Sequence, residues 1–211
     1  NTDVELYSAN FSARVKENQL NDVDVSLAMT TFNNKQYVLL NIEKLISEII
    51  NSDDEISEHF NMIVTDNGRN VELDTSTLKN VEVFPNNNVG GAGGFARGMI
   101  EALRQERKCS HVLIMDDDVL ILPESIKRLY LLLRLIKPEF LEFYIAGAML
   151  KLDDMSVLHE DTGVINKEGY FHPKKGDQRL DNPTDCALID GTWSRYDDEY
   201  AAWWFCCVPM K

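Results

Sequence analysis

The amino-acid sequence predicts an α/β fold, a mostly parallel sheet with helices on both faces. Two observations carry this prediction. From residue 23 onward, apolar strand patterns alternate with segments of helical periodicity, and polar residues follow each of the first four strands. Such alternation is typical of a parallel sheet that is covered by its connecting helices. We expect residues 23–211 to form one domain, truncated at its C-terminal end, and residues 1–22 to be an N-terminal segment or the tail of a preceding domain.

The first predicted strand covers residues 25–32 and ends at Asn33–Asn34, one of which is expected to cap the following helix. The apolar stripe of that helix recurs at helical spacing and comprises Val38, Ile42, Leu45, Ile46 and Ile49. The acidic residues 53–58 are expected to form a solvated connection. The second strand, residues 60–65, stops at the turn sequence Asp66–Asn67–Gly68.

The third predicted strand is short, residues 81–84, and a loop rich in Asn and Gly follows it over residues 85–94. Helical periodicity then runs from residue 95 to residue 107. The fourth strand, residues 111–115, leads directly into three consecutive aspartates.

A helix is expected from Pro123 to about residue 137, because the missing N–H of proline is no loss in the first helical turn. Residues 144–150 are expected to form a fifth strand, with poorly defined strands after it. The apolar run at residues 203–208 is expected to lie exposed near the end of the chain and to promote self-association.

The charge balance narrows the classes of ligand. Lys plus Arg number 21 and Asp plus Glu number 35, which gives a net charge of −14. A broad basic face for nucleic acid is therefore not expected, nor is strong attraction of this segment alone to anionic lipid. A diphosphate would need a local reversal of the field, which a divalent cation held by carboxylates supplies.

The four cysteines are Cys109, Cys186, Cys206 and Cys207, and none forms a C-x-x-C pair. We interpret the adjacent Cys206 and Cys207 as reduced core thiols, which suits a reducing compartment. No signal peptide and no transmembrane run is visible in the sequence.

The polar clusters follow strands that would lie side by side. In a parallel sheet, ligands bind beyond the carboxyl ends of the strands. The sequence therefore predicts one crevice lined by residues that are far apart along the chain, namely residues 31–34, 66–68, 86–94 and 116–118.

The three aspartates are the strongest candidates for a metal site. Alternation along an extended chain places Asp116 and Asp118 on one side and Asp117 on the other. Two carboxylates on one side can hold Mg²⁺ or Mn²⁺ and leave positions for phosphate oxygens. The alternative is a helix cap or a solvated acidic turn. We favour the metal, because three carboxylates at the end of a buried strand repel one another without a counter-charge.

The Gly-rich segment 86–97 is the second candidate. Glycines let a backbone approach a ligand closely, and the helix that follows points N–H groups at it. Arg97 could reach a phosphate or a carboxylate. The segment also contains Gly91-x-Gly93-x-x-Ala96, a partial dinucleotide fingerprint that would suit an oxidoreductase. We disfavour that alternative because the motif follows the third strand and its loop is long.

Other candidates carry weaker signals. Asp66 and Asn67 could bond to a nucleoside, or they could serve only the turn before Gly68. Trp203 and Trp204 could give a sugar a flat apolar face, or they could pack in the core.

Taken together, these residues resemble the family 2 glycosyltransferases, whose Rossmann-like fold is called GT-A. The blocks agree in order and approximate spacing over residues 23–209. The matching blocks are Thr30–Asn33, Asp66–Gly68, Asn88–Gly98, Asp116–Asp118 and Trp203–Trp204. The last three more narrowly resemble bacterial galactofuranosyltransferases. Rhamnosyltransferases that use dTDP-rhamnose share several blocks and remain an alternative.

The resemblance implies inverting transfer of a sugar, with galactofuranose as the best match, from a UDP-sugar to a glycan or lipid-linked acceptor in cell-wall polysaccharide synthesis. It implies that Asp116 and Asp118 hold Mn²⁺ or Mg²⁺ and that Trp203 and Trp204 face the donor sugar or the acceptor. The residues that it places around the nucleotide and donor are Thr31, Phe32, Asn33, Asp66, Asn88, Gly90, Gly91, Arg97, Asp116 and Asp117.

The family's catalytic base and a further histidine metal ligand come after the tryptophan pair, and we expect them beyond Lys211. These 211 residues alone are therefore expected to bind UDP without transferring sugar. A nucleotide-sugar-binding module without turnover is the alternative from a different class. We expect a cytoplasmic location, either free or at the inner face of the membrane with the parent protein membrane-associated. Oligomerisation is left open.

Overall fold

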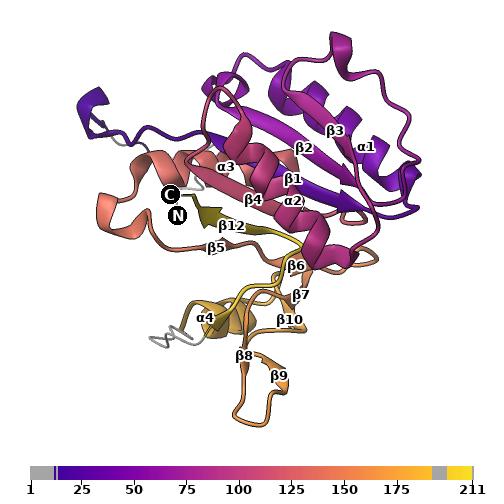
Figure 1. Ribbon diagram of the computed structural model, residues 1–211. Coiled ribbons are helices and arrows are strands. Elements are labelled where there is room, and N and C mark those ends of the chain that lie inside the picture. The colour runs from indigo at the N-terminus through magenta and orange to yellow at the C-terminus, as the bar shows by residue number, and fades with distance from the viewer. Residues whose placement is uncertain (1–11, 13, 192–198, 211) are drawn as a thin grey trace, which may run out of the picture.

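In the computed structural model, the described residues are 12, 14–191 and 199–210. The central sheet has six strands in the order β3-β2-β1-β4-β12-β5 (Figure 1). The first four of these run parallel to one another, and β12 runs antiparallel to both β4 and β5. The mostly parallel sheet is thereby confirmed.

The strands of this sheet are β1 (Val25–Thr31), β2 (Phe60–Asp66), β3 (Val81–Pro85), β4 (His111–Asp116), β5 (Ile145–Ala146) and β12 (Cys206–Pro209). The α-helices are α1 (Lys35–Leu45), α2 (Gly90–Arg104), α3 (Pro123–Leu135) and α4 (Pro183–Gly191). The shorter helical segments are η1 (Glu17–Gln19), η2 (Ile46–Ile50), η3 (Glu55–Glu58), η4 (Thr75–Thr77) and η5 (Pro138–Phe140).

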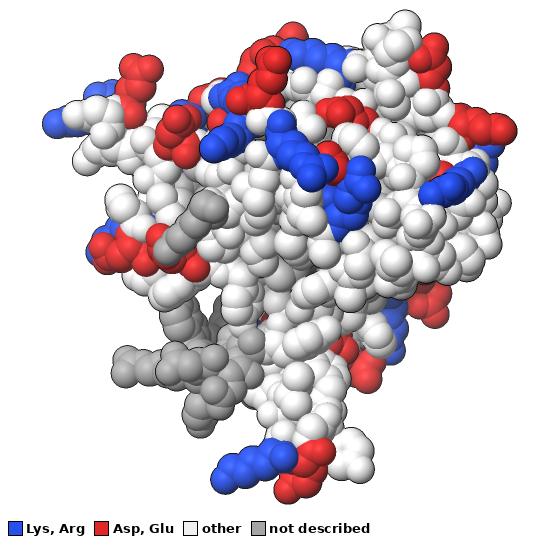
Figure 2. All heavy atoms as spheres, in the orientation of Figure 1, with Lys and Arg blue, Asp and Glu red and all other residues white. Residues whose placement is uncertain are grey.

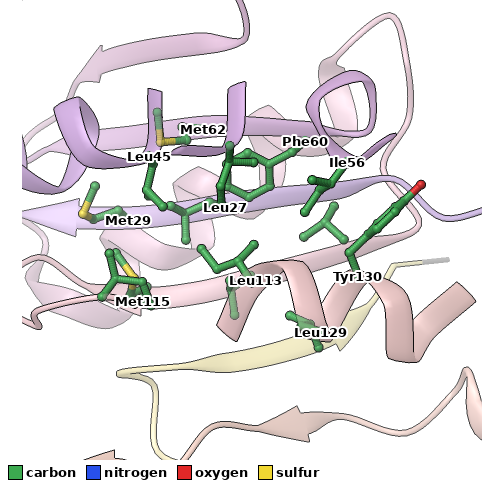
Figure 3. Packing of buried hydrophobic residues seen from close by; sticks show 14 of the residues in the cluster. Leu27, Met29, Leu45, Ile56, Phe60, Met62, Leu113, Met115, Leu129 and Tyr130 are labelled. Carbon is green, nitrogen blue, oxygen red and sulfur yellow. The ribbon is translucent and has the colours of Figure 1, made fainter. Parts of the chain in front are cut away.

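Alternate residues of the central strands point to opposite faces, and each face has its own apolar cluster. Leu27 of β1 and Leu113 of β4 pack with α1 and α3, as Figure 3 shows. Ala28 of β1 and Ile114 of β4 pack with α2 on the other face. Both faces are covered, so β1, β2 and β4 are buried over nearly their whole length.

Helix α2 lies unusually close to β1 because two glycines face the sheet. A Cβ added at Gly94 would stand 2.8 Å from Thr30 Oγ1, and one at Gly98 would stand 3.0 Å from Ala28 Cβ. This close approach fixes the start of α2 over the carboxyl end of β1.

The chain between β5 and β12 forms an extension with two small sheets, below the central sheet in Figure 1. One sheet has the order β10-β7-β6 and contains β6 (Met149–Leu150), β7 (Val157–Glu160) and β10 (Gln178–Arg179). The other has the order β11-β8-β9 and contains β8 (Gly163–Ile165), β9 (Phe171–Pro173) and β11 (Glu199–Tyr200).

Two element boundaries differ from the prediction. Helix α2 begins at Gly90 and not at residue 95, so the predicted loop is shorter and its glycines are helical. The strand expected at residues 144–150 is divided into β5 and β6, which belong to different sheets. The break lies at Gly147, where an added Cβ would stand 2.5 Å from Phe205 Cδ1.

Three local expectations were also wrong. Asn34 occupies the N-cap position of α1, as expected, but it makes no side-chain cap there; its side-chain amide instead donates to Asp117. Residues 53–58 are not only a solvated connection, since η3 buries Ile56. The apolar run at residues 203–208 is not an exposed end, because Cys206 and Cys207 are buried in β12 between β4 and β5.

Other expectations hold. Pro123 stands in the first turn of α3, and the four cysteines are free. Asn21 donates to the carbonyls of Leu133 and Ile136 and so holds residue 21 against the end of α3, while the boundary at residue 22 stays a prediction. Within the described ranges, no helix combines the length and apolarity needed to cross a bilayer.

Candidate functional site

The ends of β1 and β4 lie side by side, because Thr30 pairs with Asp116 in the parallel ladder. Beyond this point Thr31 is buried, and its hydroxyl oxygen has no hydrogen-bond partner within the described residues. Phe32 is 50% exposed. Asn33 adopts a φ of 61°, and its Oδ1 accepts a 3.2 Å hydrogen bond from Asn70.

The turn after β2 is held by a buried carboxylate. Asp66 accepts hydrogen bonds from the backbone N–H groups of Gly68 at 3.0 Å and Val71 at 2.7 Å. Its side chain thus stabilises the turn. The neighbouring Asn67 donates to the Gly90 carbonyl at 3.1 Å, which ties the end of β2 to the start of α2.

The start of α2 is open toward the same edge. Asn88 Oδ1 accepts a 3.1 Å hydrogen bond from the Gly90 N–H, and Gly90 has a φ of +76° that a side chain would strain. Gly91 is exposed, and an added Cβ would meet only Phe95, at 4.0 Å. Helix N-termini favour phosphate groups, so this turn suits a diphosphate.

Arg97 lies about two turns into α2 and has partners there. Its Nε donates to Glu101 at 2.5 Å, and its guanidinium lies 5.7 Å from the centroid of the Phe84 ring. A contact between Arg97 and a nucleotide, as the resemblance implies, would need a different rotamer. It stays a prediction.

The three aspartates after β4 have different surroundings. Asp117 is buried, and its Oδ1 accepts a 3.3 Å hydrogen bond from Asn34. Asp116 is half-buried and Asp118 is exposed. Burial raises the pKa of Asp116, and the nearby charges of Asp118 and Asp117 raise it further. Asp117 therefore faces the start of α1, although residues 117–118 form a turn and not the extended chain from which the alternation was predicted.

The raised pKa of Asp116 bears on whether a cation suits the site. The charged form of Asp116 is disfavoured by burial and by two like charges, and a divalent cation would offset both effects. Among the described residues, no three His, Cys, Asp or Glu side chains gather closely enough to bind a metal unaided. Asp116 and Asp118 fit such an ion only if phosphate oxygens and water complete its shell.

The tryptophan pair lies beside the same edge. The ring of Trp203 meets that of Phe95 of α2 edge to face, with centroids 5.5 Å apart, and Trp203 is 41% exposed. Trp204 is half-buried, and its Nε1 donates to the Gly147 carbonyl at 3.4 Å. Trp203 is thus available to a ligand, while Trp204 holds the break between β5 and β6.

The sequence interpretation missed two side chains that shape this edge. Asn41 of α1 is buried, and its amide donates to the carbonyls of Asp117 at 3.1 Å and Val119 at 3.0 Å. Arg69 donates to the Asn86 carbonyl at 2.9 Å and places a cation at the edge. The signal for Asn41 was a polar residue on the buried side of a helix; Arg69 lies in a turn and gave no signal.

Two concave regions of about 450 and 410 Å³ lie elsewhere. The first is lined by α1 and by Leu73 and Leu78. The second lies beside the amino end of β1, around Asp24, His59 and Arg107. Neither region adjoins the carboxyl edge, where the aspartates, the start of α2 and Trp203 are the groups that could contact a ligand.

These features define the class of protein: an α/β domain with a polar carboxyl edge suited to a phosphorylated ligand. No protein-family model matches the chain. The particular relatives are bacterial. Galactofuranosyltransferase GlfT2 of Mycolicibacterium smegmatis is 26% identical over 232 aligned positions, which cover 100% of this chain and 34% of the relative. Galactofuranosyltransferase GlfT2 of Mycobacterium tuberculosis is 33% identical over 134 positions, which cover 59% of this chain and 20% of the relative.

The chain is therefore similar in sequence to bacterial galactofuranosyltransferases, and it spans about a third or less of the length of these relatives. A solved structure of mannosyltransferase PcManGT from Pyrobaculum calidifontis, in complex with GDP-Man and Mn²⁺, is 16% identical, with a TM-score of 0.39 over 64% of this chain and 38% of that one.

Proposed function

We propose that this chain is the nucleotide-sugar-binding part of a metal-dependent, inverting glycosyltransferase. The parent protein would transfer galactofuranose from a UDP-sugar to a glycan or lipid-linked glycan. Similarity to two galactofuranosyltransferases supports the reaction class. The transfer itself belongs to the parent protein, because the chain spans only part of those relatives.

The observation that carries the proposal is the pair Asp116 and Asp118 at the end of β4, with the pKa of Asp116 raised by burial and by its neighbours. The pair would hold Mn²⁺ or Mg²⁺, and that ion would neutralise charge on the departing diphosphate. The open first turn of α2 would donate N–H groups to the same phosphates. Phe32 and Asn33 would lie against the nucleoside, and Trp203 against the donor sugar or the acceptor.

The position of the glycines favours a UDP-sugar over a dinucleotide. Gly91 and Gly93 lie inside α2, which follows the edge strand β3, whereas a dinucleotide fingerprint forms the tight turn after the first strand. After β1 the chain has Phe32, Asn33 and Asn34 in that place. A binding module without turnover would share this pocket and differs only in the parent's activity.

Isothermal titration of UDP with Mn²⁺ and with EDTA tests the proposal. We expect Mn²⁺ to tighten UDP binding by about tenfold or more, which corresponds to roughly 1.4 kcal/mol. In Asp118→Asn the enhancement should largely disappear. Equal UDP affinity in Mn²⁺ and EDTA would contradict the metal role, and tight NAD binding without UDP binding would contradict the nucleotide-sugar assignment.

A further inference from the structure

Within the described residues, one face of the outer sheet in the extension carries no charged side chain and is exposed to solvent. In the register of β8, β9 and β11, Gly163 pairs with Pro173 and Tyr200, and Ile165 pairs with Phe171. Paired residues share a face, so Gly163, Ile165, Phe171, Pro173 and Tyr200 form one side of this sheet. Ile165 is 54% exposed, Phe171 40% and Tyr200 39%. We call this set the aromatic face.

The aromatic face is held in a fixed arrangement. The rings of Phe171 and Tyr200 meet edge to face with centroids 5.5 Å apart. Phe171 lies across Gly163, since a Cβ added there would stand 2.5 Å from Phe171 Cζ. The hydroxyl of Thr162 donates to the Tyr200 carbonyl at 2.9 Å and anchors β11 beside β8. The rings are therefore presented to solvent with little freedom left to lose on binding.

A short stretch of chain joins the aromatic face to the candidate site. Tyr200 stands three residues before Trp203, a span of at most about 11 Å of extended chain. Trp203 in turn packs on Phe95 beside the start of α2. The extension leads away from the central sheet in Figure 1, and the surface visible along it in Figure 2 is mostly white, with blue and red atoms at its tip.

We propose that the aromatic face, together with Trp203, binds the glycan acceptor as an extended neutral saccharide. Sugar rings have apolar C–H faces that pack on aromatic rings, and they carry no charge. An uncharged aromatic surface on a chain of net charge −14 suits that chemistry better than it suits nucleic acid or an anionic membrane. The inference rests on the proposed function and deepens it by locating the acceptor.

The test measures two ligands separately on the same 211 residues. Isothermal titration is done with a galactofuranose tetrasaccharide and, independently, with UDP and Mn²⁺. We expect Phe171→Ala and Tyr200→Ala each to weaken tetrasaccharide binding by about tenfold and to leave UDP binding within about twofold. Tyr37→Ala, which removes an exposed ring on α1, is the matched control and should change neither.

A conservative change separates the surface from the fold. Tyr200→Phe keeps the ring and should keep tetrasaccharide affinity within about threefold. Tetrasaccharide affinity that is unchanged in folded Phe171→Ala and Tyr200→Ala would overturn the inference, as would UDP binding by the wild type without any tetrasaccharide binding. A wild-type dimer in sedimentation that both alanine variants dissociate would also overturn it, because the face would then be a subunit contact. Failure of UDP to bind, with tetrasaccharide binding intact and ring-dependent, would instead contradict the proposed function alone.

Discussion

The side-chain amide of Asn34 donates a hydrogen bond to Asp117 Oδ1, over 3.3 Å, across the gap between the ends of β1 and β4. Asn41, about two turns further along α1, donates to the backbone carbonyls on both sides of Asp118, those of Asp117 and Val119. Helix α1 thus fixes the turn that carries the candidate metal ligands. The exposed Asp118 is thus positioned by the side-chain amides of Asn34 and Asn41, which need not contact the ion themselves.

Replacing Asn41 should therefore affect both stability and ligand binding. Asn41→Ala leaves the buried carbonyls of Asp117 and Val119 without their donor, which should lower the free energy of unfolding by about 1–3 kcal/mol. The loosened turn should also weaken UDP binding in Mn²⁺. Urea unfolding and titration measure the two effects. Leu40→Ala is the matched control, since Leu40 is the exposed neighbour on the same helix; equal losses in both variants would contradict this role for Asn41.

The glycines of α2 should divide into two functional types. Gly94→Ala places a Cβ 2.8 Å from Thr30 Oγ1 and 3.1 Å from Asn67 Nδ2, so we expect a loss of about 1–3 kcal/mol in stability. Gly91→Ala meets only Phe95 at 4.0 Å, and because Gly91 is helical it should raise stability by about 0.5–1 kcal/mol. Thermal unfolding of the two variants checks this order.

The glycine variants also test where the ligand binds. If a diphosphate approaches the first turn of α2, Gly91→Ala should weaken UDP binding although the protein is more stable. A Gly91→Ala variant that is stable and binds UDP like the wild type would show that the approach lies elsewhere. A substitution at Gly93 would not isolate the effect on the ligand, because its added Cβ would stand 3.0 Å from Val89 Cβ and would also disturb the protein.

His111 should make stability depend on pH. Burial lowers the pKa of this residue, while the hydrogen bond of its Nε2 to the Leu141 carbonyl at 3.2 Å acts in the opposite direction. The pKa of histidine in the unfolded chain is about 6.5. Below that pH the unfolded chain binds a proton that the folded chain does not bind, so stability is lost as pH falls toward the lowered pKa of the folded state. Above about pH 6.5 neither state binds the proton, so stability no longer depends on pH through this residue.

Comparison of variants isolates this contribution. His111→Gln should be less stable than the wild type at pH 7.5, and the gap in Tm should narrow by about 2–4 °C at pH 5, which corresponds to roughly 1 kcal/mol in a chain of this size. His172→Gln, at an exposed position, should follow the wild type at both values. A gap in Tm for His111→Gln that stays constant with pH would contradict a neutral buried imidazole.

The parts of the fold that the sequence predicted are those whose signals are local. β1, β2 and β4 are long apolar runs, and their ends were located within about one residue. The start of α2 was missed because glycines normally weaken a helix, and here they are required by contact with β1, which lies far away in the sequence. The place of β12 was missed for a similar reason, since Cys206 pairs with Ile114 and no nearby residue indicates that pairing.

The candidate site divides in the same way. The aspartates, Asn88 and Trp203 could be selected from their residue types and positions at strand ends. The partners that already engage Arg97 and Asp66 are visible only in the structure. Asp66 holds its own turn, and Arg97 meets Glu101 one helical turn later. The sequence gives the residue type and hence what a side chain can bind. The structure adds the hydrogen bonds that the side chain already makes and would have to give up on binding a ligand.

The adjacent residues Asp117 and Asp118 should differ in their effect on the metal. Asp118 is exposed, and its charge, like that of Asp117, helps to raise the pKa of Asp116, so its carboxylate is close to Asp116 and free to take a cation ligand's role. Asp117 is buried and accepts the hydrogen bond from Asn34, and its Oδ2 has no hydrogen-bond partner among the described residues. Substitution by asparagine preserves shape at both positions and removes one charge from each.

In Asp118→Asn we therefore expect UDP affinity in Mn²⁺ to exceed that in EDTA by no more than about twofold, because the ion loses a ligand. Asp117→Asn should retain most of the enhancement, with any loss arising from the weaker local negative charge. Titrations of both variants in Mn²⁺ and in EDTA give the two ratios directly, and circular dichroism confirms that each variant is folded. An Asp117→Asn variant that loses the enhancement while Asp118→Asn keeps it would reverse the assignment and place the ion on the α1 side of the turn, beside Asn34.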